Sequence, residues 1–307
     1  MVTRAHIAFI GGASSAGARK VGQEGTPLLL RQAGLIEAIQ REGVTVTDFG
    51  DIGPFVFEPD PLNRHQQNLP RVVSVAQEVF DQVGKAVEAG AFPVVIGGDC
   101  TITLGALAGL RSAVRSIGLV YFDGDVDLHT PETTESGIFD GMGMAHIVGA
   151  ADNALANLTS KRPLLDRRKV VLFGFDEEWV DPAEKRLLSE WDFTAFSRDD
   201  VMIEPICAAE HARAAVERES RSYLLHFDVD VVAYDQLPVA DVPHFNGMPL
   251  SAALASLAVF CSGPVAGFVL TEYNATSDAD GVVAASFVQK LAPLLARAAT
   301  THGAAAR

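Results

Sequence analysis

The segment SIGLVYFDGDVDLHT, residues 116–130, sets three carboxylates, Asp123, Asp125 and Asp127, directly behind an apolar run. A short continuous apolar run of this kind predicts a strand that is buried in the protein. Three neighbouring carboxylates at the end of a buried strand repel one another and lose hydration, unless a cation lies among them. The segment therefore predicts a cation site at the carboxyl end of a buried strand.

Strand-like apolar runs alternate with helix-like segments along the chain. Strand followed by helix, repeated about eight times, is typical of a parallel sheet wrapped by helices. No internal repeat, low-complexity tract or linker interrupts the pattern, so we expect a single domain over residues 1–307. The expected strands are His6–Ile10, Val44–Asp48, Pro93–Gly97, Gly118–Asp123, Lys169–Gly174, Phe193–Phe196, Tyr223–Asp228 and Val265–Glu272. The expected helices are Thr26–Arg41, Arg71–Ala89, Thr101–Arg115, Pro182–Glu190, Ile206–Arg218, Ser251–Phe260 and Ala279–Ala299.

The composition is that of a globular protein with an acidic surface. The 307 residues are 48% hydrophobic and 21% charged, and the formal net charge is −15. Negative charge argues against nucleic acids and anionic membranes as partners, and it favours cationic substrates. The cysteines, Cys100, Cys207 and Cys261, have no regular spacing, which is typical of reduced thiols. The N-terminal apolar run is too short for a signal peptide, and none approaches the roughly 20 residues of a membrane span, so we expect a cytoplasmic protein.

A second pair of carboxylates follows another apolar run in HFDVDVVAYD, residues 226–235. Alternate residues of an extended segment point to the same side, so Asp228 and Asp230 can face the first cluster together. In an open parallel sheet, ligands bind at the carboxyl ends of the strands, where Asp99 and Glu272 are also expected. Paired hard cations with oxygen ligands explain two such clusters in one chain.

Simpler interpretations compete with a metal site at some of these motifs. The segment DGDVD, residues 123–127, starts like a calcium-binding EF-hand loop, but Leu128 and Thr134 replace the glycine and glutamate of that loop. A solvated acidic turn is the remaining alternative, and the apolar run before it makes this the weaker one. GGDC, residues 97–100, taken alone is a tight turn with an aspartate cap and a small core cysteine. GGASSAGAR, residues 11–19, lacks the spacing of a dinucleotide-binding motif, and we interpret it as an ordinary loop.

Taken in order, these motifs resemble those of the ureohydrolase (arginase–agmatinase) family, and the similarity covers nearly the whole chain. The matching stretches are VGQEGTPLLLRQAGL, FPVVIGGDCTITLGALAGL, FDGDVD, HFDVDVVAYD and TEYN. The resemblance implies a three-layer α/β/α fold with a central eight-stranded parallel sheet. It also implies two Mn²⁺ ions, bridged by a hydroxide that attacks a guanidinium carbon, and assembly into a homo-oligomer.

The resemblance assigns roles to individual residues as well. The ligands implied for one metal ion are Cys100, Asp123, Asp127 and Asp228, and those for the other are Asp123, Asp125, Asp228 and Asp230. Glu272 would pair with the guanidinium group, and Asp127 or Asp140 would relay protons to the leaving amine. The residues expected along the rest of the substrate are His129, Thr134, Ser136 and Asp181.

The chain departs from the family pattern at the positions of the metal ligands and of the proton shuttle. Cys100 and Asp125 stand where the family has metal-binding histidines, and Asp140 replaces its proton-shuttling histidine. Five carboxylates and a thiolate carry more negative charge than two divalent cations, and this excess raises the pKa of a bound water. The thiolate suits a softer ion, whereas the carboxylates suit Mn²⁺, Mg²⁺ or Ca²⁺.

The sequence therefore predicts a metal-dependent hydrolase that cleaves a C–N bond in a small guanidino compound. One alternative keeps catalysis but changes the substrate to a formimino or other amidino compound. The other alternative is a catalytically impaired arginase-fold protein that binds a metal or a guanidino ligand without turnover. The three replaced histidines motivate this second alternative.

Overall fold

The computed structural model describes residues 5–305, so residues 1–4 and 306–307 of the expected single domain lie outside the described residues. Its strands are β1 (His6–Ser14), β2 (Thr45–Phe55), β3 (Phe92–Ile96), β4 (Ile117–Phe122), β5 (Val170–Phe173), β6 (Thr194–Phe196), β7 (Ser222–Asp228) and β8 (Val265–Thr271). They form one eight-stranded sheet in the order β2-β1-β3-β8-β7-β4-β5-β6, in which every neighbouring pair is parallel. The predicted eight-stranded parallel sheet is confirmed.

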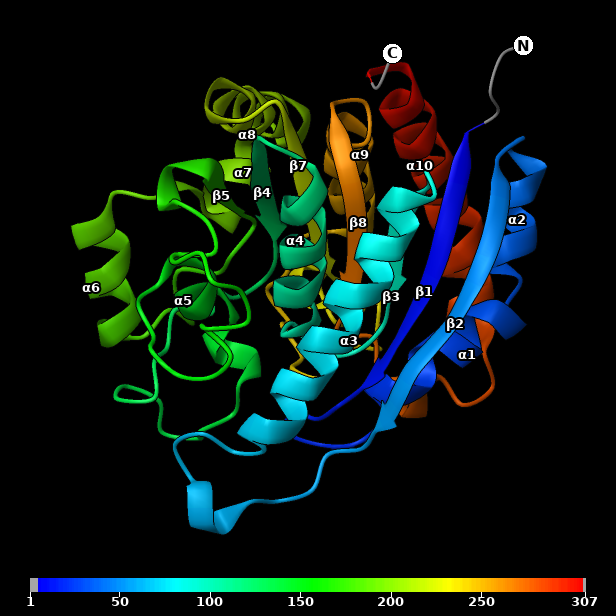
Figure 1. The fold of residues 1–307 in the computed structure, drawn as a ribbon. Coiled ribbons are helices and arrows are strands. Elements are labelled where there is room, and N and C mark those ends of the chain that lie inside the picture. The colour runs from blue at the N-terminus through cyan, green and yellow to red at the C-terminus, as the bar shows by residue number, and fades with distance from the viewer. Residues whose placement is uncertain (1–4, 306–307) are drawn as a thin grey trace.

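Helices cover both faces of this sheet (Figure 1). They are α1 (Thr26–Gln32), α2 (Leu35–Arg41), α3 (Leu69–Glu88), α4 (Ile102–Ala113), α5 (Gly143–Val148), α6 (Pro182–Trp191), α7 (Arg198–Ile203), α8 (Pro205–Glu219), α9 (Leu250–Phe260) and α10 (Val282–Ala305). In Figure 1, α3 and α4 lie in front of the sheet, whereas α9 and α10 lie behind it. The predicted three-layer α/β/α class is therefore confirmed.

Two separate apolar cores hold the three layers together. Along β1, Ile7 and Phe9 belong to the core that includes α2, α8, α9 and α10. Ala8 and Ile10, between and beside them, belong to the core under α3 and α4. This alternation is the two-residue period of a strand, and it places apolar side chains on both faces. A sheet buried on both faces leaves the carboxyl edge of its strands as the place for polar chemistry.

Helix α10 is apolar enough to be mistaken for a membrane span. By length and hydropathy, its segment Val282–His302 could cross a bilayer, and half of the apolar window is buried inside the structure. Leu291 and Leu295 are fully buried in the core behind the sheet. The apolar character of this helix is explained by packing against the sheet.

The structure corrects one predicted helix. The expected helix Thr26–Arg41 is divided into α1 and α2, with Gly34 between them at a φ of +83°. Glycine adopts this left-handed conformation without the steric cost of a Cβ, and it ends α1 in the usual manner of a helix terminus. Two short helices, α5 and α7, were not predicted at all.

The glycine-rich segment after the first strand was also misinterpreted. The residues expected to form a loop, Gly11–Ser14, continue β1 and pair with an extension of β2 that runs to Phe55. A Cβ on Gly11 would overlap the Asp51 carboxylate and lie 2.9 Å from Pro27. The glycines at this point therefore permit close packing between the strand end and α1.

We predict that Gly105→Ala destabilises the protein by about 1–3 kcal/mol, because a Cβ there would overlap the Ala76 carbonyl oxygen on α3 and lie 2.8 Å from Val79 Cβ. The matched control is Gly84→Ala on α3, where nothing lies within 4 Å of an added Cβ. Without a clash, the better helix propensity of alanine should stabilise the control by about 1 kcal/mol. Urea unfolding measures both, and equal effects of the two substitutions would contradict the predicted packing of α4 on α3.

Candidate functional site

The candidate site lies where the four central strands of the sheet end. Cys100 follows β3, Asp123 follows β4, Asp228 is the last residue of β7 and Glu272 follows β8. These four strands are neighbours in the order β3-β8-β7-β4, so the four residues meet at one edge. They line a cavity of about 480 Å³ whose wall carries ten carboxylate side chains against one arginine and one histidine.

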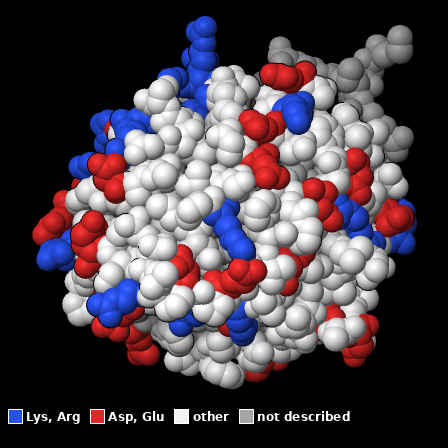
Figure 2. All heavy atoms as spheres, turned by 60° about the horizontal axis from the view of Figure 1, so that its bottom comes forward, with Lys and Arg blue, Asp and Glu red and all other residues white. Residues whose placement is uncertain are grey.

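The surface around the cavity carries both acidic and basic side chains, unlike the cavity wall. Figure 2 turns the lower end of Figure 1 forward and shows acidic and basic side chains interspersed over this side. The cavity wall is thus far richer in acidic side chains than the face around it.

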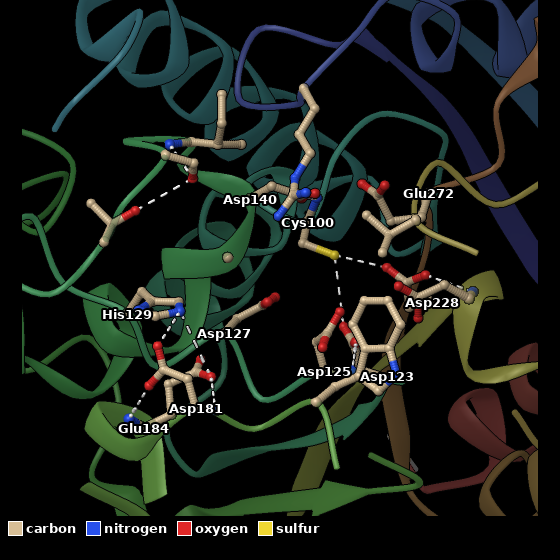
Figure 3. Close-up of a pocket in the computed structure, with 18 of the residues that line it drawn as sticks. Cys100, Asp123, Asp125, Asp127, His129, Asp140, Asp181, Glu184, Asp228 and Glu272 are labelled. Carbon is tan, nitrogen blue, oxygen red and sulfur yellow. Dashed lines mark hydrogen bonds and ion pairs between the residues drawn. The ribbon is translucent and has the colours of Figure 1, made fainter. Parts of the chain in front are cut away.

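The thiol of Cys100 lies at the centre of the deepest group of polar side chains. Its Sγ lies 2.8 Å from Asp228 Oδ2, to which it donates, and 3.7 Å from Asp123 Oδ2 (Figure 3). Burial, and next to it the charges of Asp228 and Asp123, raise the pKa of this thiol well above its ordinary value. Without a cation, Cys100 therefore keeps its proton.

A histidine from β7 completes this deep group. His226 Nε2 lies 3.1 Å from Asp123 Oδ2 and 3.9 Å from Cys100 Sγ, and the residue is fully buried. Burial lowers the pKa of His226 to about 3, so the imidazole is neutral. One donor atom from each of Cys100, Asp123, His226 and Asp228 lies within 4.8 Å of the others, which is close enough for a shared metal ion.

A second group of possible ligands lies nearer the opening. His244 Nε2 lies 3.2 Å from Asp125 Oδ2 and 3.9 Å from Asp230 Oδ2, and Trp179 packs on its ring at a centroid distance of 4.4 Å. Although burial opposes it, the hydrogen bond to Asp125 and the charge of Asp230 raise the pKa of His244 to about 9. In the absence of a metal ion, the protonated imidazole compensates part of the negative charge.

The buried carboxylates of the site are held near one another at a cost. Burial, followed by the charge of Asp228, raises the pKa of Asp123 well above its ordinary value. Burial and the charge of Asp230 do the same for the pKa of Asp228. The pKa of Asp230 rises to about 6, mainly through burial. These shifts express the unfavourable desolvation and repulsion that a bound cation would remove.

Two carboxylates of the site sit in unusual backbone conformations. Asp127 has a φ of +51° and Glu272 has a φ of +61°, in a region that favours glycine. The Tyr121 hydroxyl donates to Asp127 Oδ2, and the main chain of Glu272 donates to Gly98 O. Strained backbone held in place by its surroundings is common where a side chain must be aimed at a ligand.

Asp140 and Glu272 form a pair of neighbouring carboxyl groups beside Cys100, with one donor atom of each of the three residues within 4.8 Å of the others. Burial, followed by the charge of Asp99, raises the pKa of Asp140 well above its ordinary range, so the pair retains a proton at neutral pH. Asp140 Oδ1 also accepts from Cys100 N at 2.8 Å, and Glu272 Oε2 accepts from Gln23 Nε2 at 2.5 Å. Glu272 Oε1 is buried and has no hydrogen-bond partner among the described residues.

The wall opposite Glu272 is built on the start of α6. The Asp181 side chain accepts from the backbone of Ala183 and Glu184, and Glu184 accepts in return from Asp181 N. This capping box fixes the carboxylates of the helix start. His129 Nε2 lies 3.2 Å from Asp181 Oδ2 and 3.8 Å from Glu184 Oε2 (Figure 3).

The loop that carries Thr134 and Ser136 forms the outer rim of the cavity. Thr134 Oγ1 accepts from Gly137 N at 3.0 Å, and Ser136 Oγ accepts from Ile138 N at 3.2 Å. Gln67 holds the loop from outside through hydrogen bonds to the carbonyls of Ser136 and Gly137. The two hydroxyl groups are therefore positioned by the loop itself, at the edge of the cavity.

All the residues that the sequence analysis proposed as ligands or catalytic groups line this one cavity, and so do His129, Thr134, Ser136 and Asp181. Their roles stay predictions. Asp99 does not belong to the group, because its carboxylate accepts from the backbone of Gly17 and Thr101 and stabilises the turn after β3. Sequence reasoning missed His226, although its place two residues before Asp228 on a strand points it to the same side.

The comparisons with known proteins agree with this geometry. The family model described as "Arginase family" matches residues 5–293. The chain is 31% identical over 195 residues to an arginase of Bacillus subtilis (strain 168), a match that spans 64% of this chain and 65% of the relative. It is 26% identical to an arginase of Brevibacillus brevis over 263 residues, which is 85% of this chain and 87% of the relative.

A solved arginase structure has the same fold. The crystal structure of arginase from Bacillus cereus superposes with a TM-score of 0.86 at 26% identity, covering 95% of this chain and 98% of that one. Since the family model matches nearly the whole chain, the resemblance seen in the sequence is confirmed: this chain belongs to the arginase family of ureohydrolase-type hydrolases.

Proposed function

We propose that the protein hydrolyses a C–N bond of a small cationic guanidino or amidino compound with the help of two divalent cations. The observation that carries this proposal is the meeting of buried carboxylates and a thiol from four strand ends in one cavity of an arginase-family chain. Location in the cytoplasm and assembly into a homo-oligomer stay predictions from the sequence.

The residues present fit two cations. The deep group Cys100, Asp123 and Asp228, with Asp127 beside it, would hold one ion, and Asp125 and Asp230 with the remaining oxygens of Asp123 and Asp228 would hold the other. Manganese, the ion that the resemblance implies, suits the oxygen-rich outer group. When bound, the ions would offset the carboxylate charge and supply an activated water.

The charge of the cavity supports a cationic substrate. Its wall carries one arginine and one histidine, and that histidine, His129, already lies against Asp181 and Glu184. Glu272 offers a buried carboxyl oxygen without a partner among the described residues, and although burial and Asp140 raise the pKa of Glu272, a cationic N–H donor placed there would stabilise its ionised form. A guanidinium placed against Glu272 would present its central carbon toward the deep carboxylates.

The reaction adds one water to the guanidinium carbon and breaks the bond from that carbon to the substituted nitrogen. The water oxygen and the two unsubstituted nitrogens stay on the carbon and leave as urea, while the substituted nitrogen leaves as an amine. This nitrogen must gain a proton as the bond breaks. Asp140, whose pKa is raised by burial and by Asp99, keeps a proton that it can donate to the amine, and Asp127 is the alternative donor.

The direct test is hydrolysis of arginine, agmatine, guanidinobutyrate and guanidine by the metal-loaded protein, with urea as the measured product. We expect one of these compounds to yield urea with Mn²⁺ or Zn²⁺ bound. Calorimetric binding of a guanidino ligand without any urea, in protein shown to contain metal, would contradict hydrolysis. That outcome would support the alternative of a binding protein that has lost turnover.

We predict that Asp140→Asn lowers kcat by about 100-fold to 10,000-fold with little change in KM, because it removes the proton donor but keeps an acceptor for Cys100 N. The control is Glu132→Gln, an exposed carboxylate in the same loop region that does not line the cavity. Steady-state kinetics on both variants measure the effect. An unchanged kcat for Asp140→Asn would assign the proton transfer to another group.

The raised pKa values predict the pH dependence of stability without metal. The folded state keeps protons on Asp123, Asp228 and Asp230 that the unfolded state releases above about pH 4. These three carboxyl groups therefore contribute stability that is lost as pH rises above about 4, on the order of 3 kcal/mol from Asp230 alone. His226, with a pKa of about 3 in the folded state, contributes the opposite change up to about pH 6.5.

Metal binding should cancel this loss, because cations stabilise the ionised carboxylates. Urea unfolding between about pH 5 and 8, with chelator or with saturating metal, measures both curves. The stabilisation by metal is expected to grow as pH rises. A stabilisation by metal that stays level or falls over this range would mean that the carboxylates are not buried together.

A further inference from the structure

The chain lacks histidine at the two motif positions where the resemblance implies it, yet the deep group contains one from another strand. His226 Nε2 lies 3.1 Å from Asp123 Oδ2 and 3.9 Å from Cys100 Sγ. It comes from the interior of β7, not from the segments that carry Cys100 and Asp125. The question is whether this ring serves only to pack the core.

The residues around His226 fix the orientation of its imidazole ring. It stacks on Tyr121 with a centroid distance of 4.0 Å and an interplanar angle of 6°. Its Nδ1 lies 2.8 Å from Thr103 Oγ1, which leaves Nε2 to face Asp123 and Cys100. Leu224, two residues earlier on the same side of β7, shows that an apolar residue can fill such a position. An imidazole buried here needs polar partners at both nitrogens.

We propose that His226 is a metal ligand, and that Cys100, Asp123, His226 and Asp228 hold a zinc-type ion in the deep position in preference to manganese. The inference needs the proposed metal centre but not the proposed hydrolysis. It assigns an ion and a ligand from outside the motif positions, and both can be tested on the metal itself.

The spacing of the donor atoms fits a four-coordinate ion. Zinc bonds of about 2.0–2.3 Å to oxygen, nitrogen and sulfur in a tetrahedron place neighbouring donors about 3.3–3.8 Å apart. The separations from Cys100 Sγ to Asp123 Oδ2 and to His226 Nε2 are 3.7 and 3.9 Å, and that from His226 Nε2 to Asp123 Oδ2 is 3.1 Å. The shorter distance, 2.8 Å from Cys100 to Asp228, is a hydrogen bond whose proton a cation would replace.

The donor types select the ion, and the neighbouring residues orient the donors. A thiolate and an imidazole bind zinc and cobalt much better than manganese, which lies at the weak end of the divalent series. Thr103 lies against the outer nitrogen of His226, and Thr271 Oγ1 donates to Asp228 Oδ2 at 2.9 Å. Partners of this kind fix the direction of metal ligands.

The first measurement is metal selection by the full-length protein. After dialysis against equal concentrations of Zn²⁺ and Mn²⁺, we expect the chain to retain about one equivalent of zinc. With one equivalent of Co²⁺, the sulfur ligand should produce a near-ultraviolet charge-transfer band and four-coordinate visible bands. Cys100→Ser should lose the charge-transfer band, whereas Cys261→Ser, a buried thiol on the other side of the sheet, should keep it.

The second measurement tests His226 by zinc-edge X-ray absorption at one equivalent of zinc. The wild-type spectrum should contain sulfur at about 2.3 Å together with imidazole scattering. The imidazole scattering should vanish in His226→Gln and persist in His146→Gln, which removes a buried histidine bonded to Met142 O away from the site. If His226→Gln fails to fold, the sulfur and imidazole signals of the wild-type protein decide.

Three results would overturn the inference: retention of manganese over zinc, absence of the sulfur signal, or imidazole scattering unchanged in His226→Gln. The last result would mean that His226 only positions Asp123. These readouts are separate from turnover. A zinc–sulfur–imidazole centre without urea production would support this inference and contradict the proposed hydrolysis, while urea production without sulfur ligation would do the reverse.

Discussion

The repulsion among buried carboxylates at the ends of four adjacent strands is the constraint on which the rest of the site depends. Asp123 and Asp228 lie on neighbouring strand ends, yet 105 positions separate them along the chain, so only the fold brings them together. Burial raises the pKa values of both groups, and the charge of Asp228 adds to this for Asp123, as that of Asp230 does for Asp228. Ionising these groups in the metal-free fold therefore costs free energy. A bound cation stabilises the ionised carboxylates, and this stabilisation contributes to the free energy of metal binding. The parallel sheet that brings the carboxylates together therefore also forms the metal site.

The residues around the carboxylates orient them in the absence of any ligand. Tyr121 holds Asp127 and stacks on His226, so one side chain orients a carboxylate and an imidazole together. Asp140 accepts from the backbone of Cys100 and lies beside Glu272, which brings the proposed proton donor next to the residue proposed to hold the substrate. The groups replacing the family histidines are therefore not isolated substitutions. They belong to a connected polar network in which each member fixes another.

Much of the fold and of the site could be predicted from the sequence, because period-two spacing after apolar runs is a strong signal. It placed Asp123, Asp125, Asp127, Asp228 and Asp230 at strand ends. The sequence failed where a local pattern had two structural solutions: Gly34 interrupts a helical period that reads as continuous, and Gly11–Ser14 extend a strand although their composition is that of a loop. His226 escaped notice because it lies inside an apolar strand, where its partners Thr103 and Tyr121 are remote in sequence.

The measurement that tests the central claim most directly is anomalous diffraction at the zinc and manganese edges from crystals grown with both ions. The account predicts two anomalous peaks between the ends of β4 and β7, each within about 2.6 Å of carboxylate oxygens, with zinc at the peak beside Cys100. Ordered carboxylates surrounding only water at saturating metal, or Asp123 and Asp228 found apart from each other, would contradict it.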